Sequence, residues 1–263
     1  MELLLIESLK MDEKELKNFL DDKALFYNQK WFILKDPVSI PHCFTQKEDI
    51  EISAFLTAII SWGQRPMILK KATLLMEMMD NSPFEFITQS SIKEFVKFNK
   101  FVYRTFNGID CTYFINAVRE IYLNHGGLEN VFMNGYGNNS VKEALICFRR
   151  LFLSFSPIDR TCKHVANVEK NASAKRLNMF LRWMVRDDKI VDFGLWKGIS
   201  ASDLMIPLDI HSGRTARKLG ILQRRQDDWK AVEELTLKLK LFNPNDPVFY
   251  DYALFGLGVY EKF

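Results

Sequence analysis

Glycine and proline are scarce in this chain, whose 263 residues include only 12 glycines and 8 prolines. Because these two residues supply most tight turns, the composition argues against a turn-rich β-sandwich and favours helices. No apolar run approaches the length that spans a bilayer, so we expect no membrane partner. The apolar stretch near the N-terminus follows Glu2 and precedes no small-residue cleavage site, which does not fit a secretory leader.

Cysteine is also rare, and the chain has no CxxC pair and no clustered ligand spacing. This excludes the usual zinc and iron–sulfur sites, and we expect neither a metal nor a cofactor. Scattered thiols in a chain without a secretory leader are typical of a cytoplasmic protein with buried, reduced cysteines. The four are Cys43, Cys111, Cys147 and Cys162.

A large net charge is absent as well: the formal value is +3, with 26% charged and 48% hydrophobic residues. That composition is typical of a globular protein and does not by itself indicate a nucleic-acid partner. Residues 170–218, however, hold ten Lys or Arg against five acids, a local charge of +5. A basic surface of this kind can attract a polyanion, but taken alone the feature favours the simpler interpretation of a solvated face without a partner.

Helical periodicity dominates the rest of the chain. Ile52, Phe55, Leu56, Ile59 and Ile60 form one stripe of an amphipathic helix, and no segment alternates long enough to indicate a strand. We therefore predict an all-α fold with two helical lobes and a cleft between them. Residues 48–190 would form a central lobe, and residues 1–47 with 191–263 a second lobe built from both termini.

The segment KRLNMFLRWM predicts a helix that begins at Lys175. Its apolar stripe is expected to be buried, which places Lys175, Arg182 and Arg186 on the opposite face, with Met179 beside them and Trp183 at the margin. The positive end of the helix dipole disfavours a charged lysine in the first turn, and a neutral amine is the form needed for Schiff-base chemistry. The alternative is an ordinary solvated lysine.

The segment PLDIHSGRTARKLG predicts a second helix, capped by Asp209. His211, Ser212 and Arg214 follow at its start, where free amides bind phosphate well. The alternative is an ordinary aspartate cap. Taken together, an amine, a carboxylate and a phosphate-binding helix start are what cleavage of an N-glycosidic bond in DNA requires.

These segments resemble the helix-hairpin-helix base-excision DNA glycosylases, the endonuclease III and 8-oxoguanine glycosylase superfamily. PLDIHSGRTARKLGIL matches the segment with the catalytic aspartate, and KRLNMFLRWM the helix that starts with the catalytic lysine. IISWGQRPMILKKA and FVYRTFNGIDCTYFINAVREIYLNHGG resemble earlier helices of the family, and YDYALFGLG the last helix of the 8-oxoguanine branch. The whole chain looks most similar to an uncharacterised bacterial family within this superfamily.

The resemblance implies a function and a set of site residues. Lys175 would be the nucleophile and Asp209 the catalytic carboxylate of a glycosylase with AP-lyase activity, acting on an oxidised purine such as 8-oxoguanine. The partner would be double-stranded DNA containing a damaged base, bound by a monomer that is cytoplasmic and nucleoid-associated on DNA. The other implied residues are, for DNA, Gln64, Arg65, His211, Ser212 and Arg214, and, for the base pocket, Met179, Trp183, Asp251 and Phe255.

Two features depart from the family pattern. VEKNASAK stands where the family has a glycine-containing hairpin, and Lys175 and Asp209 are 34 positions apart, as in the longer interval of the archaeal 8-oxoguanine branch. Two other functions therefore stay open: a non-catalytic DNA- or damage-binding protein on the same scaffold, and a helical scaffold that binds protein. RNA or a free nucleoside also stays possible as substrate.

Overall fold

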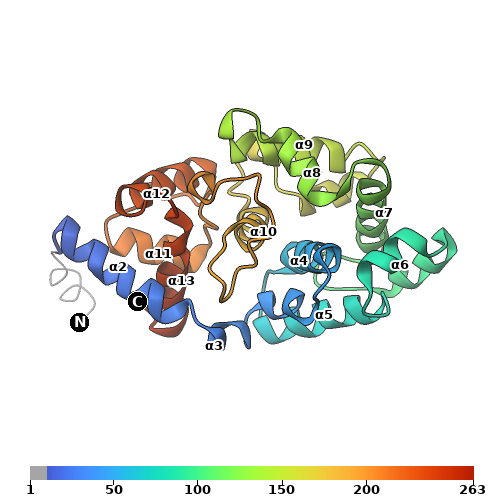
Figure 1. The fold of residues 1–263 in the computed structure, drawn as a ribbon, viewed down its shortest axis with the longest axis horizontal. Coiled ribbons are helices and arrows are strands. Elements are labelled where there is room, and N and C mark those ends of the chain that lie inside the picture. Colours follow the sequence, from blue (N-terminus) through green and yellow to red (C-terminus); the bar gives the residue numbers. More distant parts are fainter. Residues whose placement is uncertain (1–10) are drawn as a thin grey trace.

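The computed structural model describes residues 11–263, and this part of the chain is helical with only two isolated β-bridges and no strand (Figure 1). The all-α prediction is confirmed. The α-helices are α2 (Glu13–Tyr27), α3 (Lys30–Ile33), α4 (Lys47–Ile60), α5 (Arg65–Glu77), α6 (Pro83–Gln89), α7 (Gly108–Asn124), α8 (Gly127–Gly135), α9 (Val141–Phe152), α10 (Lys175–Val185), α11 (Ile210–Lys218), α12 (Trp229–Phe242) and α13 (Asp251–Tyr260).

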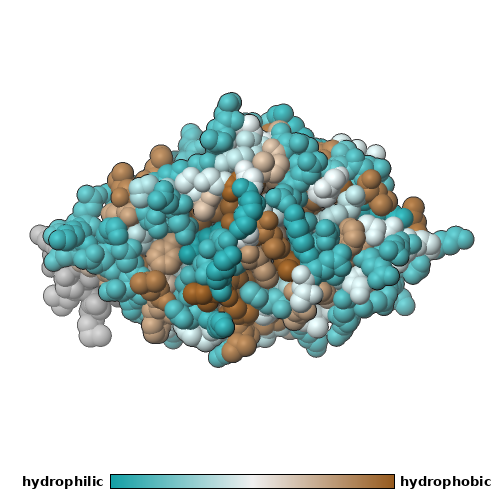
Figure 2. Space-filling model, in the orientation of Figure 1, coloured by the Kyte–Doolittle hydropathy of each residue, from teal (hydrophilic) through white to brown (hydrophobic). Residues whose placement is uncertain are grey.

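The helices form two groups with α10 between them (Figure 1). In one group, α13 packs on α2 and α11; in the other, α8 packs on α9, α7 on α8, and α6 on α4 and α7. The 3₁₀ helices Pro37–Ser39 and Pro41–Cys43 contact α4, so the N-terminal segment reaches the second group as well. Figure 2 shows apolar residues in the middle of this face, between more hydrophilic ends.

Helix α4 is more deeply placed than its sequence stripe predicts. Every residue from Ile50 to Ile60 is buried, including the polar Glu51, Ser53 and Thr57. Phe55 lies among the rings of Phe114, Phe148, Phe152 and Phe180, with centroids 5.6–6.2 Å apart. Since α10 packs directly on α4, this aromatic core fixes the helix that carries Lys175.

The cysteines are less buried than the sequence predicted. Cys43 and Cys147 are exposed and Cys162 is partly exposed, so only Cys111 is the buried thiol that the sequence predicted. The reason is that composition indicates the usual burial of a residue type but not the side of a helix on which it falls.

Among the described helices, none is long and apolar enough to cross a membrane.

Candidate active site

Lys175 and Asp209 lie together although 34 positions separate them. The Lys175 Nζ atom is 3.6 Å from Asp209 Oδ2, and the two side chains are 29% and 16% exposed. Lys175 is the first residue of α10, and Asp209 is the N-cap of α11. The amine and the carboxylate are therefore adjacent, held by two helix ends, and still open to solvent or to a ligand.

The Asp209 carboxylate has two functions at once. Its Oδ1 accepts hydrogen bonds from the backbone N–H groups of His211 and Ser212, both at 2.8 Å, while Oδ2 faces Lys175. These amides are consequently not free for a phosphate, which corrects the expectation for this helix start. Ser212 is fully buried and Arg214 is exposed, so Ser212 is no surface contact and Arg214 alone of the two reaches solvent.

A cavity of about 730 Å³ lies beside this pair and is lined from both helix groups. That volume falls within the range of small-molecule sites. Of the residues predicted for the site, seven line it, namely Arg65, Lys175, Met179, Asp209, His211, Asp251 and Phe255. Gln64 does not: it is an exposed residue at the N-cap of α5.

Trp183 is not a pocket residue, contrary to the sequence prediction. Its side chain is 0% exposed and does not line the cavity. On α10 the cavity is instead lined by Lys175, Arg176, Met179 and Arg182, whose spacing follows one helix face. Trp183 falls on the same side of α10 by helical angle, but its fully buried side chain packs into the core.

Arg65, for which the resemblance implied a DNA contact, forms part of the cavity wall. Its guanidinium carbon lies 4.7 Å from the centre of the Phe255 ring, and Nη1 donates a hydrogen bond to the Tyr260 hydroxyl at 2.9 Å. This stack joins the start of α5 to α13 across the cavity. A base that stacked on the same face of Phe255 would have to displace the guanidinium.

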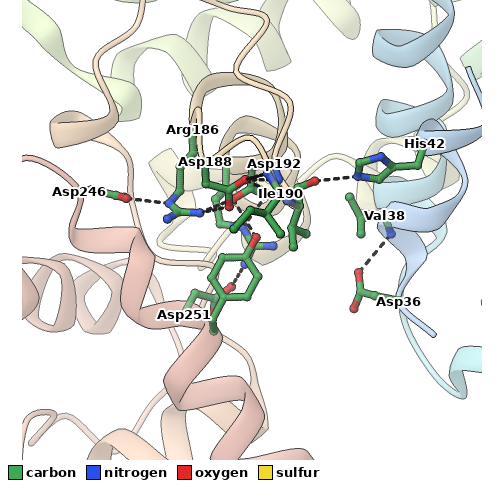
Figure 3. A network of polar contacts seen from close by, with 12 residues as sticks. Asp36, Val38, His42, Arg186, Asp188, Ile190, Asp192, Asp246 and Asp251 are labelled. Carbon is green, nitrogen blue, oxygen red and sulfur yellow. Dashed lines mark hydrogen bonds and ion pairs between the residues drawn. The ribbon is translucent and has the colours of Figure 1, made fainter. Parts of the chain in front are cut away.

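Arg182 and Arg186 are buried, which corrects their predicted place on an open face of α10. Arg182 contacts Asp251 and Asp192, and Arg186 contacts Asp188, Asp192 and Asp246. Figure 3 shows this network between α10, the loop after it and the start of α13. Burial of the two guanidinium groups is possible because each has carboxylate partners.

The loop after α10 supplies two of these aspartates, Asp188 and Asp192. Asp188 Oδ1 accepts N–H groups of residues 190–192, and Asp192 accepts the Tyr252 hydroxyl at 2.9 Å. His42 also donates to the Val191 carbonyl at 2.8 Å (Figure 3). The signal that the sequence offered was the pairing of two arginines at i and i+4 with acids closely following.

The hairpin before α10 contains no glycine, yet two of its residues adopt the left-handed backbone conformation. Asn171 (φ 65°, ψ 24°) and Ala174 (φ 52°, ψ 30°) are left-handed, a conformation that glycine adopts most easily. The Asn171 amide donates to Asp228 at 2.8 Å, and Ala172 forms a β-bridge with the same residue. These bonds anchor the start of the hairpin, and the chain enters α10 at Lys175 directly after Ala174.

This geometry can be set beside known proteins. A family model described as a protein of unknown function matches residues 36–260. The chain belongs to this DUF2400 family. The DUF2400 match includes every cavity-lining residue except Phe32. No curated protein matches the chain, and no solved structure does.

Asp251 gives the site a pH-dependent element. Burial raises the pKa of its carboxyl to about 6 from the ordinary 3.8, against the opposing charge of Arg182. A raised pKa means that the folded protein binds this proton more tightly than the unfolded chain. Its contribution to stability is therefore complete below pH 3.8 and is lost as the pH rises through about 6.

The variant Asp251→Asn tests this assignment. Between pH 4 and pH 7 we expect the free energy of unfolding of the wild type to fall by about 2 kcal/mol more than that of the variant. Urea unfolding at a series of pH values measures the difference. Equal slopes for the two proteins would show that Asp251 titrates normally in the fold.

Proposed function

We propose that this DUF2400 protein is a DNA glycosylase with AP-lyase activity that removes an oxidised purine from double-stranded DNA. One observation carries the proposal: the Lys175 amine lies 3.6 Å from the Asp209 carboxylate at the wall of a cavity of about 730 Å³. Apolar Met179 and Phe255 and the buried acid Asp251 line the same cavity. Such a lining suits a planar, polar-edged ring.

The proposed reaction begins with the damaged nucleotide turned out of the duplex, because the target bond is inaccessible in a stacked helix. Lys175 first passes a proton to Asp209, and its neutral amine then attacks C1′ of the sugar, while the C1′–N9 bond breaks with its electron pair leaving on the base. Asp209 stabilises the positive charge that develops on the sugar. Ring opening gives a Schiff base with Lys175, and β-elimination of the 3′ phosphate from it cuts the strand.

The proton that Lys175 loses needs an acceptor. Asp209 Oδ2 faces the amine at 3.6 Å, a separation that tightens readily when a substrate enters, and Oδ1 stays anchored by two amides. Asp209 then gives this proton to the leaving base and is again a carboxylate. The step therefore balances without any metal or cofactor.

Borohydride reduction on a duplex with a single 8-oxoguanine tests the proposal. A covalent protein–DNA adduct, whose mass corresponds to a reduced Schiff base, is the expected result. Salt-dependent duplex binding without an adduct would contradict it in favour of a non-catalytic DNA-binding protein. Absence of salt-dependent binding would contradict it in favour of a protein-binding scaffold.

The variant Asp209→Asn should separate the chemistry of Asp209 from its cap. The amide oxygen of asparagine still accepts the His211 and Ser212 amides, so we expect an unchanged melting temperature. The rate of base excision should fall by about 10²–10³-fold, because the negative charge next to the reacting sugar is gone. Single-turnover kinetics on the 8-oxoguanine duplex measure the rate.

A matched control is Asp12→Asn. Asp12 caps α2 through the amides of Lys14 and Glu15 in the same manner, away from the cavity. It should leave the excision rate unchanged. Equal rates in the two variants would contradict a catalytic role for Asp209.

A further inference from the structure

Asp36 is a buried acid in the cavity wall that the sequence did not indicate. It precedes the 3₁₀ helix Pro37–Ser39, is 6% exposed and lines the cavity. Its Oδ1 accepts the N–H of Val38 at 3.1 Å (Figure 3). Within residues 11–263 its side chain has no other hydrogen bond and no ion pair, so Oδ2 has acceptor capacity left for a ligand in the cavity.

Burial and the surrounding charges act on Asp36 in opposite directions. Burial is the larger effect and raises the pKa of Asp36, while the cations Arg65, Arg182 and Lys175 offset only part of that rise. All three line the same cavity, yet none lies within ion-pair distance of the acid. Asp36 thus keeps one oxygen, Oδ2, without a partner in the described residues, and it lies near cations that line the same cavity.

Asp251 is the second buried acid of the cavity, and it comes from a different element. It opens α13, and its Oδ2 is already occupied by Arg182. Figure 3 shows Asp36 and Asp251 on separate parts of the fold, with Asp36 outside the arginine network. Two buried acids therefore line the cavity, and Asp36 is the one with fewer bonds within the protein.

We propose that Asp36 selects the base, by accepting N–H hydrogen bonds from a guanine-type lesion. This inference rests on the proposed glycosylase function. A guanine edge presents N1–H and an exocyclic amino group, both donors, whereas an adenine-derived base has an acceptor at N1 beside its amino donor. A carboxylate oxygen can accept from both guanine donors, but it faces a second lone pair at N1 of the adenine edge. A site that is built to bond a donor discriminates strongly against an analogue without it.

The variant Asp36→Asn tests this selection. Its amide oxygen can replace Oδ1 at the Val38 N–H, which leaves an NH₂ donor in the position of Oδ2. We expect excision of 8-oxoguanine to fall about tenfold to a hundredfold. Excision of 8-oxoadenine should stay constant or rise. Asp22→Asn, a change at an exposed acid of α2, is the matched control and should alter neither rate.

A third substrate separates this inference from the proposed function. On a duplex with a preformed abasic site no base enters the cavity, so Asp36→Asn should give as much borohydride-trapped adduct as the wild type. An equal loss of adduct on the abasic duplex would overturn the inference and show that Asp36 supports the fold. An unchanged ratio of the 8-oxoguanine and 8-oxoadenine excision rates would overturn it as well. A wild type that traps no abasic duplex would instead refute the glycosylase/lyase itself.

Discussion

Lys175→Met is expected to abolish the borohydride-trapped adduct and to slow base excision by at least about 10³-fold. Methionine nearly matches the length of the lysine side chain but offers no amine for attack on C1′, so no Schiff base can form. The change also removes a cation that lies 3.6 Å from Asp209 Oδ2. The Asp209 cap of α11 does not depend on that cation, because it uses Oδ1 and two backbone amides.

The control for this variant is Lys14→Met. Lys14 is an exposed lysine of α2 and lies outside the cavity lining, so its loss should leave adduct formation unchanged. Trapping on both 8-oxoguanine and abasic duplexes is measured, together with the melting temperature. A Lys175→Met protein that is folded and still forms adduct would show that another amine is the nucleophile.

The parts of the site that the sequence predicted are those fixed by local rules. An aspartate before IHSGR caps a helix whatever surrounds it, and a lysine after Ala174 starts one. The proximity of the two helix starts depends on the tertiary structure. It was the family resemblance, and not periodicity, that suggested it. Periodicity did establish the all-α fold, because the apolar stripes are long and regular.

The errors share one physical cause. Arg182 and Arg186 were expected on an open face because they lie opposite the apolar stripe of α10. Instead, aspartates accompany them into the interior: Asp188 and Asp192 from the loop that follows, and Asp246 and Asp251 from far along the chain. Local sequence does not predict which ion-pair partners the folded chain will place beside a given arginine. For the same reason Asp36, whose cavity neighbours lie far along the chain, carries no signal that distinguishes it from any aspartate before a proline.

Arg186→Met should produce the largest loss of stability, about 3–5 kcal/mol in the free energy of unfolding. Removal of this guanidinium leaves three buried or half-buried carboxylates, Asp188, Asp192 and Asp246, without their shared cation. The loss should shrink as the pH is lowered and these acids become protonated. Because the same network holds Arg182 against Asp251, the variant should also loosen the cavity wall.

Arg150→Met is the matched control for this loss. Arg150 forms a single ion pair with Glu169, in which the side chains are 66% and 42% exposed, and surface pairs of this kind contribute less than about 1 kcal/mol. Denaturant unfolding of both variants at neutral pH gives the comparison. If the Arg186 variant lost no more stability than the Arg150 variant, the buried network would be dispensable for stability. The position of Asp251 in the cavity would then depend only on the packing of α13 against α2 and α11.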